Sequence, residues 1–393
     1  MNTSAKRYLL AENTIDQHDL DTLADWLRSG PWLTQGALVR DFEARWSGWL
    51  GRKRSVMVNS GSSANLLMYS ILLASDRMRN RKVVVPAVSW ATTVAPAIQL
   101  GLEPIMCDAE PRSLGIDPVQ LESILKREDP AAVIIVHVLG VPCEMDAIMK
   151  LKSRYGFLLM EDACAATGST YRGCKVGTFG DLASFSLFFG HHVSTIEGGI
   201  VSVDDEPLYD LALQLRSHGW AKDLSPEKES ALAAEHGAIE FNRPFTFYHP
   251  GYNLRSSDLN ARIGLMQMER VDHVVRRRIE NHAAYQAAFA GDSAFAVQSN
   301  PEATVCSISF AALASSQEHR ERVGKALRAG GIETRPLGGG NMARQPFWKS
   351  RYGVTEFPVA DRVHTTSFQM PNHPGLSVDD VKHIAGVVRS VRP

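Results

Sequence analysis

The sequence predicts an α/β protein, in which a mostly parallel sheet flanked by helices is followed by a smaller α+β domain. Short apolar or β-branched runs, each of a length suited to one buried strand, recur between residues 55 and 188. Stretches with helical spacing of apolar residues lie between these runs, and such alternation favours parallel strands. Beyond about residue 257 the alternation ends, which indicates a second domain.

The elements of the large domain follow one another along the chain. A helix is expected over residues 14–28, and a strand at 55–58 leads through a turn of small residues into an apolar helix. The remaining elements that we expect are strands at 83–86, 132–138, 157–161 and 184–188, and helices at 118–127 and 144–155. This order is typical of a sheet with helices on both faces.

The C-terminal part begins with a change of pattern. Ser257 and the acid after it can cap a long helix, which we expect to continue through the basic residues 276–278. A further helix is expected near 317–329. We therefore assign residues 1–265 to a large domain and residues 266–393 to a small C-terminal domain.

One long segment, residues 222–250, does not fit either pattern. It is charged at first and then rich in Phe, Tyr and Pro. Loops of this length are uncommon in compact domains and often functional, so we expect an excursion outside the core.

The composition restricts the partners and the location of the protein. The chain has 42 Lys and Arg against 43 Asp and Glu, which argues against nucleic acid or an anionic membrane as the main partner. It has no run of about 18 apolar residues and no signal-peptide core, so we expect a cytoplasmic protein. Five widely spaced cysteines without a CxxC pair argue against a disulfide framework or a zinc site.

The turn Asn59–Ala64 is a candidate anion site. It follows a strand and precedes a helix, where backbone N–H groups point outward. Its small residues permit close approach, and its hydroxyls suit a phosphate. An ordinary strand-to-helix turn uses the same residues, so this pattern alone leaves both interpretations open.

A second candidate lies where an apolar strand ends in Glu161 and Asp162. Carboxylates at the C-terminal ends of parallel strands line the crevice in which α/β proteins bind ligands. A buried acid needs a cationic or hydrogen-bonding partner, and a protonated pyridine nitrogen would serve. A carboxylate that caps a loop or pairs with an arginine is the alternative.

The third candidate is the pair His191 and His192, between an apolar strand and Glu197-Gly198-Gly199. Successive side chains of an extended backbone point to opposite faces, so the pair is poorly placed to share a metal ion. A histidine can transfer protons near neutral pH. Packing or surface exposure is the alternative.

Taken in order, these features resemble the fold-type I pyridoxal phosphate (PLP) enzymes, and more narrowly the DegT/DnrJ/EryC1/StrS sugar-aminotransferase family. The match also includes Ser89-Trp90, Gly36 with Phe42-Glu43, and Pro250–Arg255. It covers nearly the whole chain. The resemblance implies a seven-stranded, mostly parallel sheet, PLP or its amine form PMP as cofactor, and a homodimer with shared active sites.

One position departs from the family pattern. Six residues before Glu197, the family has the lysine that holds the cofactor covalently, and this chain has His191. No lysine occurs between Lys175 and Lys222 that could replace it. Because an imidazole transfers protons but forms no stable covalent link, the resemblance implies a non-covalently bound cofactor. On the alignment, His191 is preferred over His192 as the catalytic base.

Histidine at this position resembles one branch of the family, the 3-dehydratases of nucleotide-linked 4-keto-6-deoxy sugars. Agreement extends to Arg216–Trp220, Gly331–Glu333, Arg335-Pro336 and Gly340-Asn341. The resemblance implies removal of the C3 hydroxyl, most specifically from GDP-4-keto-6-deoxy-D-mannose. The product would be a 4-keto-3,6-dideoxy sugar for O-antigen deoxysugar biosynthesis, and L-glutamate would restore PMP.

The resemblance also implies roles for individual residues. Phosphate contacts are expected from Gly61, Ser62 and Ser186, and from Asn253 of the second subunit. Trp90 would stack on the pyridine ring, and Asp162 would keep the ring nitrogen protonated, so that the ring accepts electrons. His218 would contact the amino donor or the reaction centre. Sugar or nucleotide contacts are expected from Pro31, Trp32, Leu33, Thr34, Lys222, Arg255 and Glu333.

Several alternatives remain open. The related enzymes carry Gln or Glu three residues after the ring-nitrogen acid, but this chain has Ala165, so another group or water must serve the ring hydroxyl. The protein could retain aminotransferase activity, or it could be a non-catalytic paralogue that binds cofactor or nucleotide sugar. A CDP-sugar 3-dehydrase would need clustered cysteines for its iron–sulfur cluster, so we expect neither such a cluster nor a metal.

Overall fold

A computed structural model describes residues 6–393 of the chain. Its centre is a seven-stranded sheet with the order β1-β9-β8-β5-β4-β2-β3. The strands are β1 (Arg54–Val58), β2 (Lys82–Pro86), β3 (Glu103–Cys107), β4 (Ala132–Val136), β5 (Leu158–Asp162), β8 (Leu182–Ser186) and β9 (Gly199–Val203). β9 runs antiparallel to both of its neighbours, and the other pairs are parallel. The predicted α/β class and the mostly parallel sheet are confirmed.

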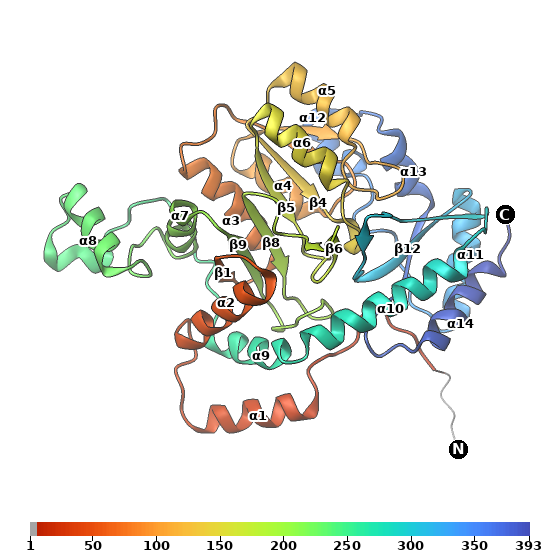
Figure 1. Cartoon of the computed structure of the whole chain (residues 1–393), viewed down its shortest axis with the longest axis horizontal. Helices are drawn as coiled ribbons and strands as arrows, with labels where there is room; N and C mark the ends of the chain where they lie inside the picture. Colours follow the sequence, from red (N-terminus) through yellow and green to blue (C-terminus); the bar gives the residue numbers. More distant parts are fainter. Residues whose placement is uncertain (1–5) are drawn as a thin grey trace.

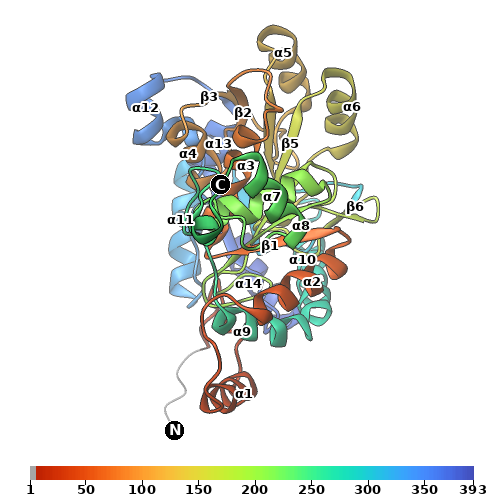
Figure 2. The same cartoon turned by 90° about the vertical axis from the view of Figure 1, so that its left-hand side faces the viewer.

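Helices cover both faces of this sheet, as Figure 2 shows for α4 and α6. In β2, Val83 and Val85 pack into one core while Val84 packs into another, because successive side chains point to opposite faces. The first core includes α3 (Gly61–Ala74), α4 (Ala91–Gln99) and α7 (Glu206–Arg216), and the second includes α5 (Pro118–Glu128) and α6 (Met145–Tyr155). A third core lies under α2 (Ala37–Leu50) and α9 (Asp258–Met268).

The C-terminal part contains a three-stranded antiparallel sheet. Its elements are β10 (Phe295–Val297), β12 (Ser309–Ala314) and β13 (Ser367–Pro371), with α10 (Val271–Phe289), α11 (Gln317–Ala329), α12 (Pro346–Tyr352), α13 (Pro358–Thr366) and α14 (Val378–Arg389). Phe310 and Ala312 of β12 pack into the small core, whereas Ala311 and Leu313 join the first core of the large sheet. The two parts therefore share packing, and the boundary at residue 265 stays a prediction.

Short elements complete the described chain. They are α1 (Gln17–Arg28), β6 (Thr170–Tyr171), β7 (Cys174–Lys175), β11 (Ala303–Thr304), η1 (Val138–Gly140), η2 (Glu240–Phe245), η3 (Met342–Arg344) and α8 (Pro226–Glu235). None of the helices within residues 6–393 is long and apolar enough to cross a membrane. The same residues contain no group of three or more His, Cys, Asp or Glu side chains arranged to hold a metal ion.

The single long helix expected from Ser257 onward is wrong. Ser257 does cap α9, but the helix ends at Met268 and α10 begins at Val271. Arg270, at the break, donates hydrogen bonds to Thr14 and to the buried carboxylate of Asp19. This contact with the segment before and within α1 accompanies the break between the two helices.

The segment 222–250 projects from the body of the molecule, as expected, and carries α8 and η2 (Figure 1). Its apolar side chains are not buried: Ile239, Phe241 and Phe245 are 68%, 91% and 71% exposed. The segment is therefore an excursion whose aromatic residues are left uncovered by the chain itself.

Candidate active site

The N-terminus of α3 forms a close-packed cradle against the end of β8. The Ser60 side chain caps the helix by accepting a backbone N–H of its first turn. A Cβ on Gly61 would lie only 2.7 Å from the Cβ of Ser186, so glycine alone permits this approach. Ser62 lies in the same first turn. The free N–H groups of the turn and the Ser186 hydroxyl thus come together, as a phosphate site requires.

The carboxylate of Asp162, at the end of β5, is held by three hydrogen bonds. Asn65 and Thr93 donate to Oδ2 at 2.9 and 2.7 Å, and the backbone N–H of Cys164 donates to Oδ1 at 3.1 Å. Ser184 donates to the Asn65 carbonyl oxygen at 2.6 Å and so fixes the amide orientation. Asp162 is 5% exposed and forms no ion pair within residues 6–393. A buried anion held only by neutral donors suits a cationic ligand group.

Trp90 lies beside this acid. It is the N-cap residue of α4, the helix whose Thr93 contacts Asp162. Its side chain is 58% exposed although Ser89, before it, is buried. An indole that protrudes next to the Asp162 cluster fits the stacking role expected of it, and that role stays a prediction.

His191 lies in the loop after β8, and its ring orientation is defined by one hydrogen bond. The Nδ1 atom is 2.9 Å from the carbonyl oxygen of Cys164. A carbonyl only accepts, so Nδ1 carries the proton and Nε2 of the neutral ring is unprotonated. Burial and the nearby charges of Arg278 and Arg335 lower the pKa of His191 to about 4. Near neutral pH, the imidazole is therefore a free base.

The neighbouring His192 contacts the C-terminal part of the chain instead. Its Nε2 atom lies 2.9 Å from the carbonyl oxygen of Cys306, and the side chain is 1% exposed. Burial and the positive charge of Arg278 lower its pKa well below the usual value. His192 is thus placed to anchor the loop, and its ring has no access to a ligand.

The fully buried Arg278 of α10 also anchors this loop. Its guanidinium donates to the carbonyl oxygens of Gly190, Ile308 and Asn372 and forms no ion pair with any described carboxylate. Gly190 has a φ of +86°, and a Cβ there would lie 2.6 Å from Ala11. The backbone before His191 is therefore fixed by Arg278 of α10 and by the N-terminal segment.

A second group of predicted residues surrounds Trp220. The Lys222 ammonium lies 4.1 Å from the Trp220 ring centroid, and the Arg255 guanidinium lies 5.8 Å from it. The His218 ring centroid lies 4.8 Å away on the same indole. Neither Lys222 nor Arg255 forms an ion pair within the described chain, although Arg255 donates to Ser217 at 3.2 Å. These cations are available to an anionic ligand.

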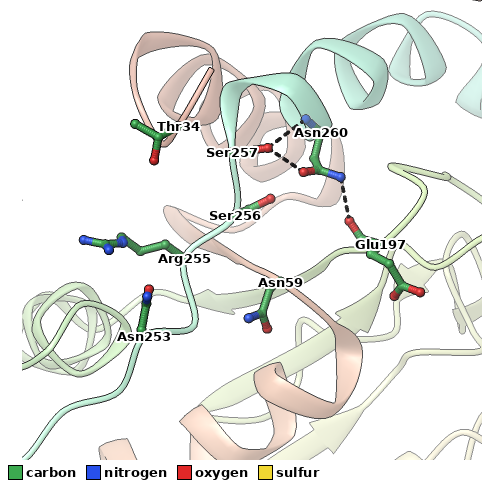
Figure 3. Close-up of a pocket in the computed structure, with 8 residues that line it drawn as sticks. All are labelled: Thr34, Asn59, Glu197, Asn253, Arg255, Ser256, Ser257 and Asn260. Carbon is green, nitrogen blue, oxygen red and sulfur yellow. Dashed lines mark hydrogen bonds between the residues drawn. The ribbon is translucent and has the colours of Figure 1, made fainter. Parts of the chain in front are cut away.

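A polar pocket of about 290 Å³ lies next to this group (Figure 3). Its lining comes from the segment before α2, the end of β1, the loop before β9 and the start of α9: Thr34, Asn59, Glu197, Asn253, Arg255, Ser256, Ser257 and Asn260. Asn260 donates to the backbone oxygen of Glu197 at 3.2 Å. The pocket thus unites the predicted residues Thr34, Asn253 and Arg255, and Asn59 adds an amide two residues before Gly61.

The other predicted contacts are more dispersed. Trp32 and Leu33 are 72% and 46% exposed, and Pro31 before them is partly buried. Glu333 instead accepts the backbone N–H of Leu10 at 2.9 Å, which ties the N-terminal segment to the small domain. Substrate contacts by these four predicted residues stay predictions.

Sequence reasoning missed the residues that hold Asp162. Asn65 and Ser184 are buried polar side chains, and Thr93 is fully buried in α4. Asn65 is the polar residue directly before the apolar run of α3, which was the one available signal. The hydrogen bonds could not be read from the sequence, because they join residues up to 119 positions apart.

Comparison with known proteins shows the family to which the chain belongs. The model of the DegT/DnrJ/EryC1/StrS aminotransferase family matches residues 13–389. The chain belongs to this family. The family resemblance seen in the sequence is confirmed, and the fold expected from it agrees with the central sheet.

Several members of the family are similar over most of their length. The GDP-4-keto-6-deoxy-D-mannose 3-dehydratase of Yersinia pseudotuberculosis is 34% identical over 339 residues, 85% of each chain. A mutant GDP-4-keto-6-deoxymannose-3-dehydratase with bound GDP-perosamine has a TM-score of 0.89 at 28% identity, covering 97% of this chain and 100% of that one. Another structure of such an enzyme, with a trapped PLP-glutamate geminal diamine, has a TM-score of 0.87 at 28% identity and the same coverage.

Proposed function

We propose that the protein is a PMP-dependent 3-dehydratase of nucleotide-linked 4-keto-6-deoxy sugars, with GDP-4-keto-6-deoxy-D-mannose as its substrate. The observation that carries this proposal is His191, whose free Nε2 stands where the family holds its cofactor covalently. Solved relatives with bound GDP-perosamine and with PLP-glutamate support the two ligand classes.

The residues present fit PLP bound without a covalent link. The cradle at Gly61 and Ser186 suits the phosphate, and Ser62 adds a hydroxyl. The buried Asp162 carboxylate, with neutral donors around it, suits a protonated ring nitrogen, and Trp90 offers a flat surface. When bound, the cofactor supplies an amine that joins the C4 carbonyl of the sugar and a ring that accepts electrons.

His191 is proposed to move the protons. Its unprotonated Nε2 accepts a proton at the start of the elimination, and the ring then becomes an imidazolium. The burial and the charges of Arg278 and Arg335, which lower the pKa of His191, also make that imidazolium a strong acid. The same ring is therefore suited to protonate the departing C3 hydroxyl, which leaves as water.

The overall chemistry balances with glutamate as the reductant. The sugar loses one oxygen atom as its C3 hydroxymethine becomes a methylene. L-Glutamate is oxidised to 2-oxoglutarate, and its nitrogen is released as ammonia. The keto oxygen of 2-oxoglutarate comes from water, and the oxygen atom lost by the sugar leaves as water, so no net water is consumed. No other electron donor and no metal is required by this balance.

The cations around Trp220 are proposed to hold the nucleotide part of the substrate. Lys222 and Arg255 lack acidic partners within the described chain and can contact a diphosphate. Thr34 and the residues Pro31, Trp32 and Leu33 lie on the exposed segment that borders the same pocket. His218, whose ring centroid lies 4.8 Å from the same indole, is proposed to reach the reaction centre.

We also propose a homodimer in which each active site uses both chains. Asn253 lines the polar pocket with Asn59 and Arg255, and its amide is free to reach a phosphate in a second subunit. The exposed aromatic residues of segment 222–250 are further candidates for that contact. Sedimentation of the purified protein should give twice the chain mass.

The test is a product assay with a panel of substrates. Purified protein with PLP and L-glutamate is incubated with GDP-, dTDP-, CDP- and UDP-linked 4-keto-6-deoxy sugars, and the products are analysed by mass. We expect the GDP-linked mannose derivative to lose one oxygen atom fastest, with release of 2-oxoglutarate. A stable 4-amino sugar would instead identify an aminotransferase, and no 2-oxoglutarate at all would indicate a non-catalytic protein.

A further inference from the structure

Arg335 lies on a segment that spans the active site. The backbone N–H of Glu333, two residues before it, donates to the carbonyl oxygen of Tyr8 at 2.8 Å. In the same N-terminal segment, Ala11 packs against Gly190, the residue before His191. Beyond it, the backbone N–H of Gly339 donates to the carbonyl oxygen of Ser89, next to Trp90, at 3.2 Å. Arg335 is therefore positioned between the loop that carries the base and the indole expected to cover the cofactor ring.

The guanidinium of Arg335 is held on one side only. Its Nε donates to the side-chain oxygen of Gln369 at 3.4 Å. Gln369 is itself fully buried and donates to the carbonyl oxygen of Pro336 at 2.9 Å, so its orientation is fixed. Within residues 6–393, the two terminal nitrogens of Arg335 have no hydrogen-bond or ion-pair partner, and the side chain is exposed. Two parallel N–H donors in this state match a carboxylate.

The two arginines that act on His191 differ in this respect. Arg278 is 1% exposed and donates its hydrogen bonds to backbone carbonyl oxygens. The terminal nitrogens of Arg335 have no partner within residues 6–393, and its charge also lowers the pKa of His191, so it lies within electrostatic reach of the imidazole. Of these two arginines, Arg335 is therefore the one with donors left for a ligand near the base.

We propose that Arg335 binds the α-carboxylate of the amino donor, L-glutamate. This inference rests on the proposed function and adds a binding residue to it. The α-carboxylate is attached to the carbon that carries the reacting amine, so it must lie close to the base. The diphosphate of a nucleotide sugar is attached to C1, across the sugar ring from the reacting C4. Cations that are unpaired within the described chain and can bind it lie at Trp220. A cation near the base therefore suits the amino acid.

The test separates the two halves of the reaction in the full-length protein. PLP-loaded enzyme is mixed with L-glutamate, and 2-oxoglutarate release and the change of cofactor absorbance are followed. We expect Arg335→Gln to raise the KM for glutamate about tenfold to hundredfold, since hydrogen bonds to charged groups contribute about 1.5–3 kcal/mol. Arg335→Lys should recover part of this loss. Arg154→Gln, an exposed α6 arginine on the outer face, is the matched control and should change nothing.

The second half uses PMP-loaded enzyme and GDP-4-keto-6-deoxymannose in a single turnover. Arg335→Gln removes one of the charges that lower the pKa of His191, so this rate can change, but by a much smaller factor than the KM for glutamate. If the variant slows both halves equally, or leaves the KM for glutamate unchanged, the proposal is overturned. If the wild-type protein fails in the second half but reacts with glutamate, the proposed dehydratase function fails while the role of Arg335 is still measured.

Analogues of the donor identify which carboxylate is bound. L-Isoglutamine carries an amide in place of the α-carboxylate, and L-glutamine carries one in place of the γ-carboxylate. The penalty of Arg335→Gln should persist with L-glutamine and disappear with L-isoglutamine. The opposite pattern would assign Arg335 to the γ-carboxylate and contradict the proposal.

Discussion

The cofactor side and the substrate side of the active site differ in how completely the chain itself builds them. Around Asp162, the donors Asn65 and Thr93 are buried, and Ser184 fixes the orientation of the Asn65 amide. Around Trp220, the cations of Lys222 and Arg255 lie against an indole without acidic partners within the described chain. The first side is pre-organised, and the second keeps its charge for a ligand.

We expect the largest mutational effect on the dehydration rate at His191, the proposed base between these two sides. We expect His191→Lys to lose dehydration by about 10²–10⁴-fold, because the variant replaces a free base with a lysine ammonium. The new lysine should also link to PLP in a form that borohydride fixes, as measured by intact mass. Borohydride should leave the wild-type protein unlabelled, and labelled wild-type protein would contradict the non-covalent site.

On the cofactor side, removal of one oriented donor should be costly. Asn65→Leu keeps a similar volume but removes a hydrogen bond to the Asp162 carboxylate. Since hydrogen bonds to charged groups contribute about 1.5–3 kcal/mol, we expect PLP to bind about tenfold to hundredfold more weakly. Fluorescence titration of the apoprotein measures this affinity. The account of Asp162 is wrong if Asn65→Leu binds PLP as tightly as the wild-type protein.

Buried histidines should also make stability depend on pH. Burial lowers the pKa values of His191 and His282 to about 4, below the usual 6.5. The unfolded chain therefore binds more protons than the folded one between these values, and the free energy of unfolding decreases as pH falls from 6.5 to 4. Each group contributes about 1.4 kcal/mol per pH unit at most.

Urea denaturation across this pH range, in the absence of ligands, measures the slope. His191→Asn removes one of the buried histidines that titrate in this range, so its slope should be smaller than that of the wild-type protein. Equal slopes would show that His191 titrates alike in the folded and unfolded states.

Single changes on the substrate side should have the smallest effects. We expect Lys222→Met to raise the KM for the nucleotide sugar up to about fivefold, since an exposed ion pair contributes about 0.2–1 kcal/mol. The effect should shrink as salt is added, whereas the Asn65→Leu effect should not. An unchanged KM at low salt would exclude Lys222 from the diphosphate contact.

The sequence predicted much of the fold because its signals there are local. The apolar runs of β2 and β4, for example, each occupy a single short stretch of the chain. The break between α9 and α10 escaped prediction because Arg270 contacts Asp19, 251 positions away. A helical pattern of apolar residues cannot report such a contact.

The candidate site was predictable where a residue type is itself unusual. A histidine in place of the expected lysine, and a chain without lysine from 176 to 221, are visible in the sequence alone. The structure adds what no residue type reveals, namely which nitrogen of His191 is free and that the His192 ring is hydrogen-bonded to the carbonyl oxygen of Cys306. The hydrogen bond of Arg335 likewise involves a residue far away in the sequence, Gln369, 34 positions later.

The central claim is that His191 performs the proton transfers of a PMP-dependent dehydration. The most direct measurement is a single turnover of PMP-loaded wild-type and His191→Asn protein with GDP-4-keto-6-deoxymannose, followed by mass. We expect the wild-type protein to form the 3-deoxy product, and the variant to bind the cofactor but react about 10²–10⁴-fold more slowly. A variant that reacts at the wild-type rate, or a wild-type product that carries a 4-amino group, would contradict the account.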